Sequence, residues 1–77
     1  MTIQSLLGPL FPELKRPLQP DDSPVTVGAW DSLRQVDVIL AVEEAFGIAL
    51  TTADIVELKS VRALVQILRR RGADIEL

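Results

Sequence analysis

The chain has 77 residues, a quarter of them charged, and a formal net charge of −3 at pH 7. A chain this short forms one small domain with a single core, so we expect one domain over residues 1–77. It contains no cysteine and no histidine. Disulfides, thiolate or imidazole metal sites and the usual nucleophile–base pairs are therefore excluded, and we expect no enzyme activity.

The sequence also argues against membrane and nucleic-acid binding. No apolar run approaches the length of a membrane span, and no secretory signal pattern stands at the N-terminus. The arginine run at 69–71 sits at one helix end instead of covering a face, and three aromatic residues are too few for a base-stacking platform. We expect a soluble cytoplasmic protein, and a monomer.

The first helical pattern is interrupted by proline. Apolar residues recur at helical spacing from Ile3 to Leu14. Pro9 and Pro12 fall inside this stripe, and an internal proline removes a hydrogen bond and clashes with the preceding turn. We therefore expect a kinked or split first helix.

A long loop follows over residues 15–30. Prolines, aspartates and a serine give it a dense series of turn signals. Loops of this length in a compact domain are commonly functional or mobile. The apolar residues that we expect to pin it to the core are Val25, Val27 and Trp30.

The strongest helix signal covers residues 32–46. Asp31 stands where a carboxylate can accept hydrogen bonds from the first turn, and Gly47 stands where helices commonly end. This predicts a four-turn helix that starts at Ser32.

Two shorter helices follow. Thr51 or Thr52 can cap a brief helix over 53–57, and Ser60 can cap a last helix that Gly72 ends. We expect the tail at 73–77 to be frayed. Without any strand pattern, the chain is predicted to be all-α: a small antiparallel bundle of three longer helices plus one short one.

The centre of the chain is acidic. Residues 28–60 hold six carboxylates against two basic side chains, a net of −4. This charge suggests a partner with a basic docking surface, although most of these residues could simply be solvated helix faces.

Residues 30–64 carry a specific resemblance. The stretch Trp30-Asp31-Ser32-Leu33, the helix that follows it and its ending Glu43-Glu44-Ala45-Phe46-Gly47-Ile48 are similar to the acyl carrier protein family. Two further short helices stand at that family's spacing. The resemblance implies an acyl-carrier-like bundle, in a Trp-Asp-Ser-Leu variant more typical of specialised pathways than of the housekeeping fatty-acid carrier.

By this resemblance, Ser32 carries a 4′-phosphopantetheine arm transferred from coenzyme A by a phosphopantetheinyl transferase. A helix start suits such a phosphodiester, because backbone N–H groups and the positive dipole end favour an anion. Asp31 would help to present the serine. Leu33 would be either an exposed partner contact or part of the core.

The resemblance also implies partner-binding residues. The acidic side chains that would meet basic grooves of other enzymes are Asp37, Glu43 and Glu44. Arg34 interrupts this acidic face. The family commonly has an acidic or neutral residue at this position, so the arginine is a departure from its pattern. Trp30 could pack over the loop, line the path of the arm or touch a partner; packing is the simplest of these.

In the family, an acyl chain can enter between the helices. The residues expected to line that interior are Val38, Ile39, Val42, Leu50, Ile55, Leu58 and Leu64. The same residues could form an ordinary packed core, and periodicity does not separate the two.

Two hypotheses follow. In the first, the chain is a discrete carrier that holds an acyl or aminoacyl group as a thioester for fatty-acid, polyketide or peptide-type enzymes. We expect it to be free-standing because of Met1 and the short tail. Its partners would be the transferase and acyl-activating, acyltransferase or condensing enzymes. In the second, the chain is a carrier-like interaction domain that is never modified.

Overall fold

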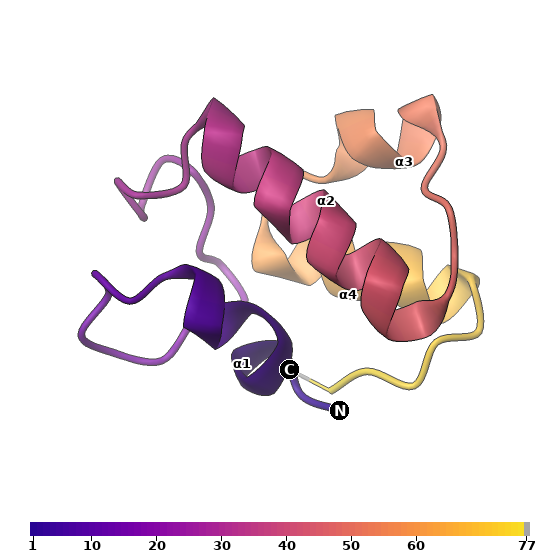
Figure 1. The fold of residues 1–77 in the computed structure, drawn as a ribbon, viewed down its shortest axis with the longest axis horizontal. Helices are drawn as coiled ribbons and strands as arrows, with labels where there is room; N and C mark the ends of the chain where they lie inside the picture. The colour runs from indigo at the N-terminus through magenta and orange to yellow at the C-terminus, as the bar shows by residue number, and fades with distance from the viewer. Residues whose placement is uncertain (77) are drawn as a thin grey trace.

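The computed structural model describes residues 1–76 and shows a small helical bundle (Figure 1). Its elements are α1 (Ile3–Leu7), the 3₁₀ helix η1 (Gly8–Leu10), α2 (Ser32–Phe46), α3 (Thr52–Glu57) and α4 (Val61–Arg70). This confirms the all-α, acyl-carrier-like architecture. No helix in the described part of the chain is long and apolar enough to cross a membrane.

The first helix is split, as predicted from its prolines. Thr2 caps α1 by accepting a hydrogen bond from the Ser5 backbone N–H at 3.1 Å. Pro9 lies in η1, near its start, where a missing N–H costs little. α1 is therefore only five residues long, and the apolar stripe up to Leu14 continues in turns instead of α-helix.

α2 begins and ends at the residues predicted. The Asp31 carboxylate accepts from the Arg34 backbone N–H at 2.9 Å. At the other end Gly47 takes a left-handed conformation with φ of 63°, and its N–H donates to the Glu43 carbonyl. Glycine adopts that conformation without the steric penalty of a side chain, which explains the sharp end.

α3 and α4 also start at the predicted caps. Thr51 and Asp54 form a reciprocal capping box, and the Ser60 hydroxyl accepts from the Ala63 N–H at 3.1 Å. The arginines at the end of α4 do more than offset the helix dipole, because Arg70 pairs with Glu57 at 2.6 Å and Arg71 pairs with Asp54.

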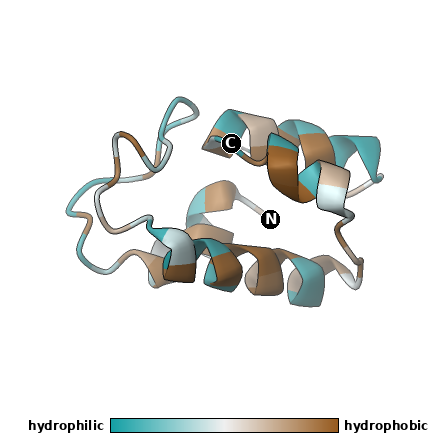
Figure 2. Cartoon of the chain, turned by 90° about the horizontal axis from the view of Figure 1, so that it is seen from above, coloured by the Kyte–Doolittle hydropathy of each residue, from teal (hydrophilic) through white to brown (hydrophobic). Residues whose placement is uncertain are grey.

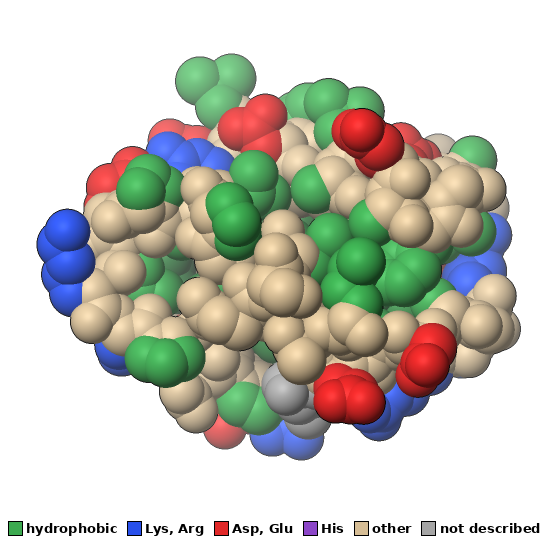
Figure 3. All heavy atoms as spheres, turned by 60° about the horizontal axis from the view of Figure 1, so that its bottom comes forward, with side chains coloured by type: hydrophobic (Ala, Val, Ile, Leu, Met, Phe, Trp, Pro, Cys, Tyr) green, Lys and Arg blue, Asp and Glu red, His purple; other side chains and the backbone are tan. Residues whose placement is uncertain are grey.

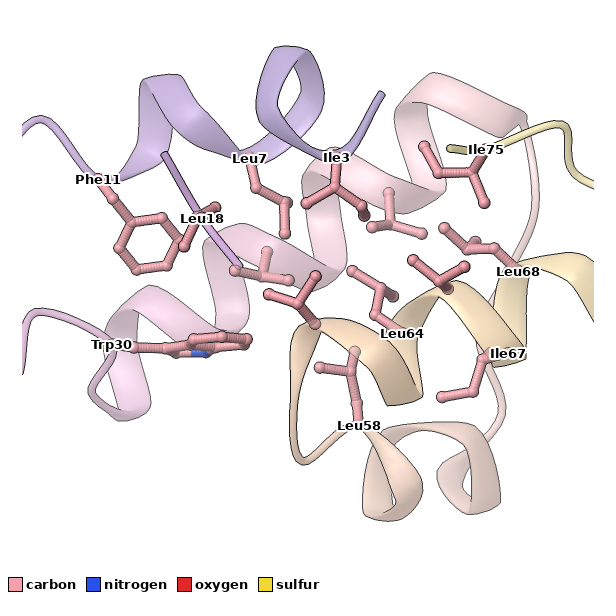
Figure 4. Packing of buried hydrophobic residues seen from close by; sticks show 14 of the residues in the cluster. Ile3, Leu7, Phe11, Leu18, Trp30, Leu58, Leu64, Ile67, Leu68 and Ile75 are labelled. Carbon is pink, nitrogen blue, oxygen red and sulfur yellow. The ribbon is translucent and has the colours of Figure 1, made fainter. Parts of the chain in front are cut away.

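The core lies where α1, α2 and α4 meet (Figure 4). α4 buries five hydrophobic side chains, whereas the longer α2 fully buries only Val38 and Val42. Hydrophobic and hydrophilic residues alternate along the length of α2 in Figure 2. α2 thus keeps much of its apolar surface outside the core.

The loop over residues 15–30 is held by a buried aspartate. The Asp22 carboxylate accepts two hydrogen bonds from Arg16, at 2.7 and 2.9 Å, and one each from the Gln19 N–H and the Thr26 hydroxyl. Its backbone carbonyl accepts from Val61 at 2.9 Å, which ties the loop to α4. The Arg16 guanidinium holds the pKa of Asp22 well below its ordinary value of 3.8.

The apolar anchors of the loop differ in part from those expected. Val27 and Trp30 are buried as predicted, and Leu18 joins them. The prediction that Val25 anchors the loop was wrong, because its side chain is 93% exposed at a turn. Turn geometry, which apolarity alone does not reveal, points it outward.

The tail is ordered up to Glu76, against the expectation of fraying at 73–77. Ile75 is buried, and Glu76 pairs with the N-terminal segment: Ile3 N–H donates to its carbonyl at 2.8 Å, and its own N–H donates to Met1 at 2.9 Å. The two ends of the chain accordingly lie together in Figure 1. Leu77, the last residue of the predicted tail, lies outside the described residues.

Candidate functional site

Ser32 is exposed and is the first residue of α2. The first-turn cap is supplied by the carboxylate of Asp31, so the Ser32 hydroxyl is not needed for it. Ser60 differs in this respect, because its own hydroxyl caps α4. The start of a fifteen-residue helix also presents free N–H groups and a positive dipole end.

A hollow of about 290 Å³ opens beside Ser32. Three parts of the chain that are distant in sequence form its walls: the loop before α2, the first turn of α2, and the connection between α3 and α4. The residues that line it are Pro24, Trp30, Asp31, Ser32, Gln35 and Leu58.

Trp30 forms one wall of this hollow from within the core. Its side chain is 2% exposed and packs against Phe11, with ring centroids 5.6 Å apart (Figure 4). A side chain this buried contacts other parts of the same chain, which leaves little of it for the partner contact that was one of its three expected roles. Of the roles considered, packing fits best, and the ring also lines the hollow.

Gln35 was not singled out in the sequence. It lies one helical turn after Ser32, and its Oε1 accepts a 2.6 Å hydrogen bond from Trp30 Nε1. Its Nε2 donates to the Leu58 carbonyl over a longer 3.4 Å. The spacing of three residues from Ser32 was the one available signal, since i and i+3 share a helix face.

Arg34, which interrupts the acidic face of α2, makes contacts within the chain. Its guanidinium pairs with Glu13 at 3.0 Å, donates to the Leu10 carbonyl and lies 5.5 Å from the centroid of the Phe11 ring. The ion pair lowers the pKa of Glu13. Arg34 thus attaches the start of α2 to the turns after α1.

The three acidic residues expected to bind partners separate into two kinds. Asp37 and Glu44 are exposed on α2. Glu43 is half-buried, and its Oε2 accepts from the Leu50 backbone N–H at 2.8 Å. Glu43 therefore holds the connection after α2, while Asp37 and Glu44 remain available to solvent.

The outer face of α2 is partly apolar. Leu33 is 80% exposed and is therefore not part of the core, and Val36 and Leu40 are more than half exposed. They surround Asp37 at helical spacing. Figure 3 shows hydrophobic side chains gathered in a patch on one face of the molecule, with charged groups near it.

The residues expected to line an acyl-chain interior fall into three groups. Val38, Val42, Leu58 and Leu64 are buried, and Ile39 and Leu50 are partly buried against the core. Ile55 is 37% exposed, so its side chain lies outside the packed core. α3 is only six residues long, too short for its apolar spacing to identify the inward face.

A small helical bundle with an exposed serine at a capped helix start is an arrangement that suits a carrier protein. A family model described as "phosphopantetheine attachment site" matches residues 13–68, which is more than half of the chain and includes Ser32. The chain belongs to this family, whose members carry 4′-phosphopantetheine covalently. Comparison with curated proteins and with solved structures returned no match.

The residues around Ser32 fit that group. The hydroxyl is accessible to a second enzyme, the helix start favours a phosphodiester, and a hollow adjoins the serine. When bound, the group would supply a thiol to a chain that has no cysteine.

Proposed function

We propose that this protein is a carrier that holds an acyl or aminoacyl group as a thioester on a 4′-phosphopantetheine arm at Ser32. The observation that carries the proposal is the position of Ser32, exposed at the first turn of α2 with its helix capped by Asp31. The family match supports a phosphopantetheine carrier, and the serine is the side chain in that setting able to accept a phosphodiester.

Ser32 acts as a passive acceptor in this proposal. No histidine is present in the chain to serve as a base, so a phosphopantetheinyl transferase deprotonates the hydroxyl. The Ser32 oxygen then bonds to the β-phosphorus of coenzyme A, and adenosine 3′,5′-bisphosphate leaves. The free N–H groups at the start of α2 stabilise the negative charge of the resulting diester.

The outer face of α2 is the proposed docking surface for enzymes that load or use the cargo. Asp37 and Glu44 supply negative charge for steering toward basic surfaces, and Leu33, Val36 and Leu40 supply apolar area once the partner is in place. Acyl-activating, acyltransferase and condensing enzymes of fatty-acid, polyketide or peptide-type pathways are the proposed users.

Loading the purified protein tests this function. Incubation with a phosphopantetheinyl transferase and coenzyme A should add one arm per chain by intact mass. Because the chain has no cysteine, the product should also gain one titratable thiol. Absence of both signals with several transferases would favour the alternative, an unmodified helical interaction domain.

A further inference from the structure

The hydrogen bonds between Trp30, Gln35 and Leu58 form a bridge across the hollow beside Ser32. Trp30 comes from the loop before α2, Gln35 from α2, and Leu58 from the connection between α3 and α4. The Gln35 side chain is therefore the link between three segments that meet next to the serine.

Gln35 keeps unused hydrogen-bonding capacity in this bridge. The indole N–H can only donate, so the amide oxygen of Gln35 must face Trp30 and its NH₂ must face Leu58. The oxygen has a second lone pair, and the NH₂ has a second proton. The bond to Leu58, at 3.4 Å, is also long for an N–H···O hydrogen bond.

The direction of helix side chains places this amide beside the serine. Side chains of an α-helix tilt toward its N-terminus, and residues three apart share a face. Gln35 therefore extends back toward the turn that holds Ser32, and both residues line the same hollow.

We propose that Gln35 is a docking residue for the arm, and that it binds a secondary amide of the phosphopantetheine chain in the hollow between Trp30 and Leu58. The inference depends on the proposed attachment at Ser32. A secondary amide offers one N–H donor and one carbonyl acceptor, which complement the spare lone pair and the spare proton of Gln35. The Trp30 ring and Leu58 provide apolar walls for the methylene groups between the amides.

The arm is the occupant that the hollow favours, because its attachment point is itself a lining residue. Ser32 and Gln35 line the same hollow, so an arm attached to the serine can reach the amide from within it. In the docked state the arm is held against the carrier, and a partner enzyme must compete with Gln35 to withdraw it.

An NMR measurement on the loaded full chain tests this inference. Trp30 is the single tryptophan, so its indole N–H gives one assignable signal. With an isotope-labelled arm, we expect NOEs from an arm amide proton to the Trp30 ring and the Leu58 methyl groups. We also expect the indole signal to shift between the unloaded and loaded protein.

Gln35→Met is the test variant and Gln66→Met, on the exposed side of α4, is the matched control. Gln35→Met should load normally by intact mass but lose about twofold to tenfold in the intensity of those NOEs, the loss expected for one hydrogen bond. The control should keep them.

The outcomes separate the two proposals. No mass increase in the wild-type protein contradicts the attachment itself. A mass increase without NOEs to Trp30 or Leu58 overturns the docking inference alone. NOEs that persist unchanged in Gln35→Met overturn the role of Gln35.

Discussion

Arg34 holds Glu13, twenty-one residues earlier in the chain, with Nη2 3.0 Å from Oε2. This ion pair joins the first turn of α2 to the turn that follows η1. It explains why a basic residue stands two positions after Ser32, inside an otherwise acidic segment. The guanidinium connects the start of α2 to the turns after η1, and its hydrogen-bond partners lie within the same chain.

Arg34→Gln is therefore expected to loosen the turns after η1. The backbone N–H groups of Phe11 and Leu14 donate to the carbonyls of Gly8 and Phe11, and they should exchange with solvent deuterium several-fold faster in the variant. Amides in the centre of α4 should keep their protection. Arg62→Gln is the control, because Arg62 pairs with the highly exposed Asp21. Equal effects of the two substitutions would contradict the structural role of Arg34.

Asp22 is expected to make stability depend on acid pH. Its folded-state pKa lies well below its ordinary value of 3.8, so the unfolded chain binds this proton more readily. The stabilisation is therefore fully present above the unfolded-state pKa and is lost as the pH falls below it toward the folded value.

Asp22→Asn removes that charge from the loop. At pH 7 the substitution should lower the free energy of unfolding by about 1–3 kcal/mol, because buried donors lose a charged acceptor. Below pH 4 the difference from wild type should shrink. Urea unfolding over this pH range measures both effects. Asp21→Asn, at the exposed neighbouring position, is the control. If the free energy of unfolding of Asp22→Asn differed from that of wild type by the same amount at every pH, stability would not be linked to protonation of Asp22.

Substitutions of the exposed acidic residues of α2 should affect loading, whereas substitution of the half-buried Glu43 should affect stability. Charge reversal at the exposed Glu44, or at Asp37, should reduce kcat/KM of the transferase several-fold at low salt, with a smaller effect at high salt, because exposed charges mainly steer encounter. Glu43→Gln should instead act on the connection that it holds through Leu50.

Thermal unfolding and steady-state loading rates separate these two effects. Glu44→Lys should leave the unfolding midpoint nearly unchanged, and Glu43→Gln should lower it. A salt-independent loss of loading in Glu44→Lys would speak against electrostatic docking.

Leu64 tests the expected acyl-chain interior. It is fully buried, so Leu64→Ala should lower the free energy of unfolding by about 2–5 kcal/mol in the unloaded protein. An acyl chain that enters the interior would fill part of the resulting cavity. The acylated variant should then be more stable than the variant with a bare arm, and equal stabilities would place the acyl chain outside the core.

The helices could be predicted closely because their signals are local. Asp31, Thr51 and Ser60 lie within three residues of the N–H groups that they cap, and Gly47 ends α2 through its own backbone conformation. Such signals depend only on neighbouring residues, which the sequence displays directly.

The partners of Trp30 and Arg34 could not be predicted in the same way. Trp30 packs on Phe11, nineteen positions earlier, and Arg34 reaches Glu13. These contacts depend on how the loop folds back over α1. The pairing of Glu76 with the N-terminus depends on tertiary structure too, and local composition gave no sign of it.

The sequence indicated the serine and the cap of the candidate site but not Gln35, which lines the hollow beside them. Ser32 and Asp31 were identified through a motif. Gln35 was missed because a glutamine at a helix surface is ordinary until the indole of Trp30 is found 2.6 Å from its amide oxygen.

The most direct test of the account is the intact mass of wild-type protein, Ser32→Ala and Ser23→Ala after incubation with a phosphopantetheinyl transferase and coenzyme A. We expect one phosphopantetheine adduct on the wild type and on Ser23→Ala, and none on Ser32→Ala. Far-UV circular dichroism of Ser32→Ala should match the wild type, because Asp31 provides the cap of α2. An adduct that persists in Ser32→Ala, or its absence from the wild type, would contradict the attachment at Ser32.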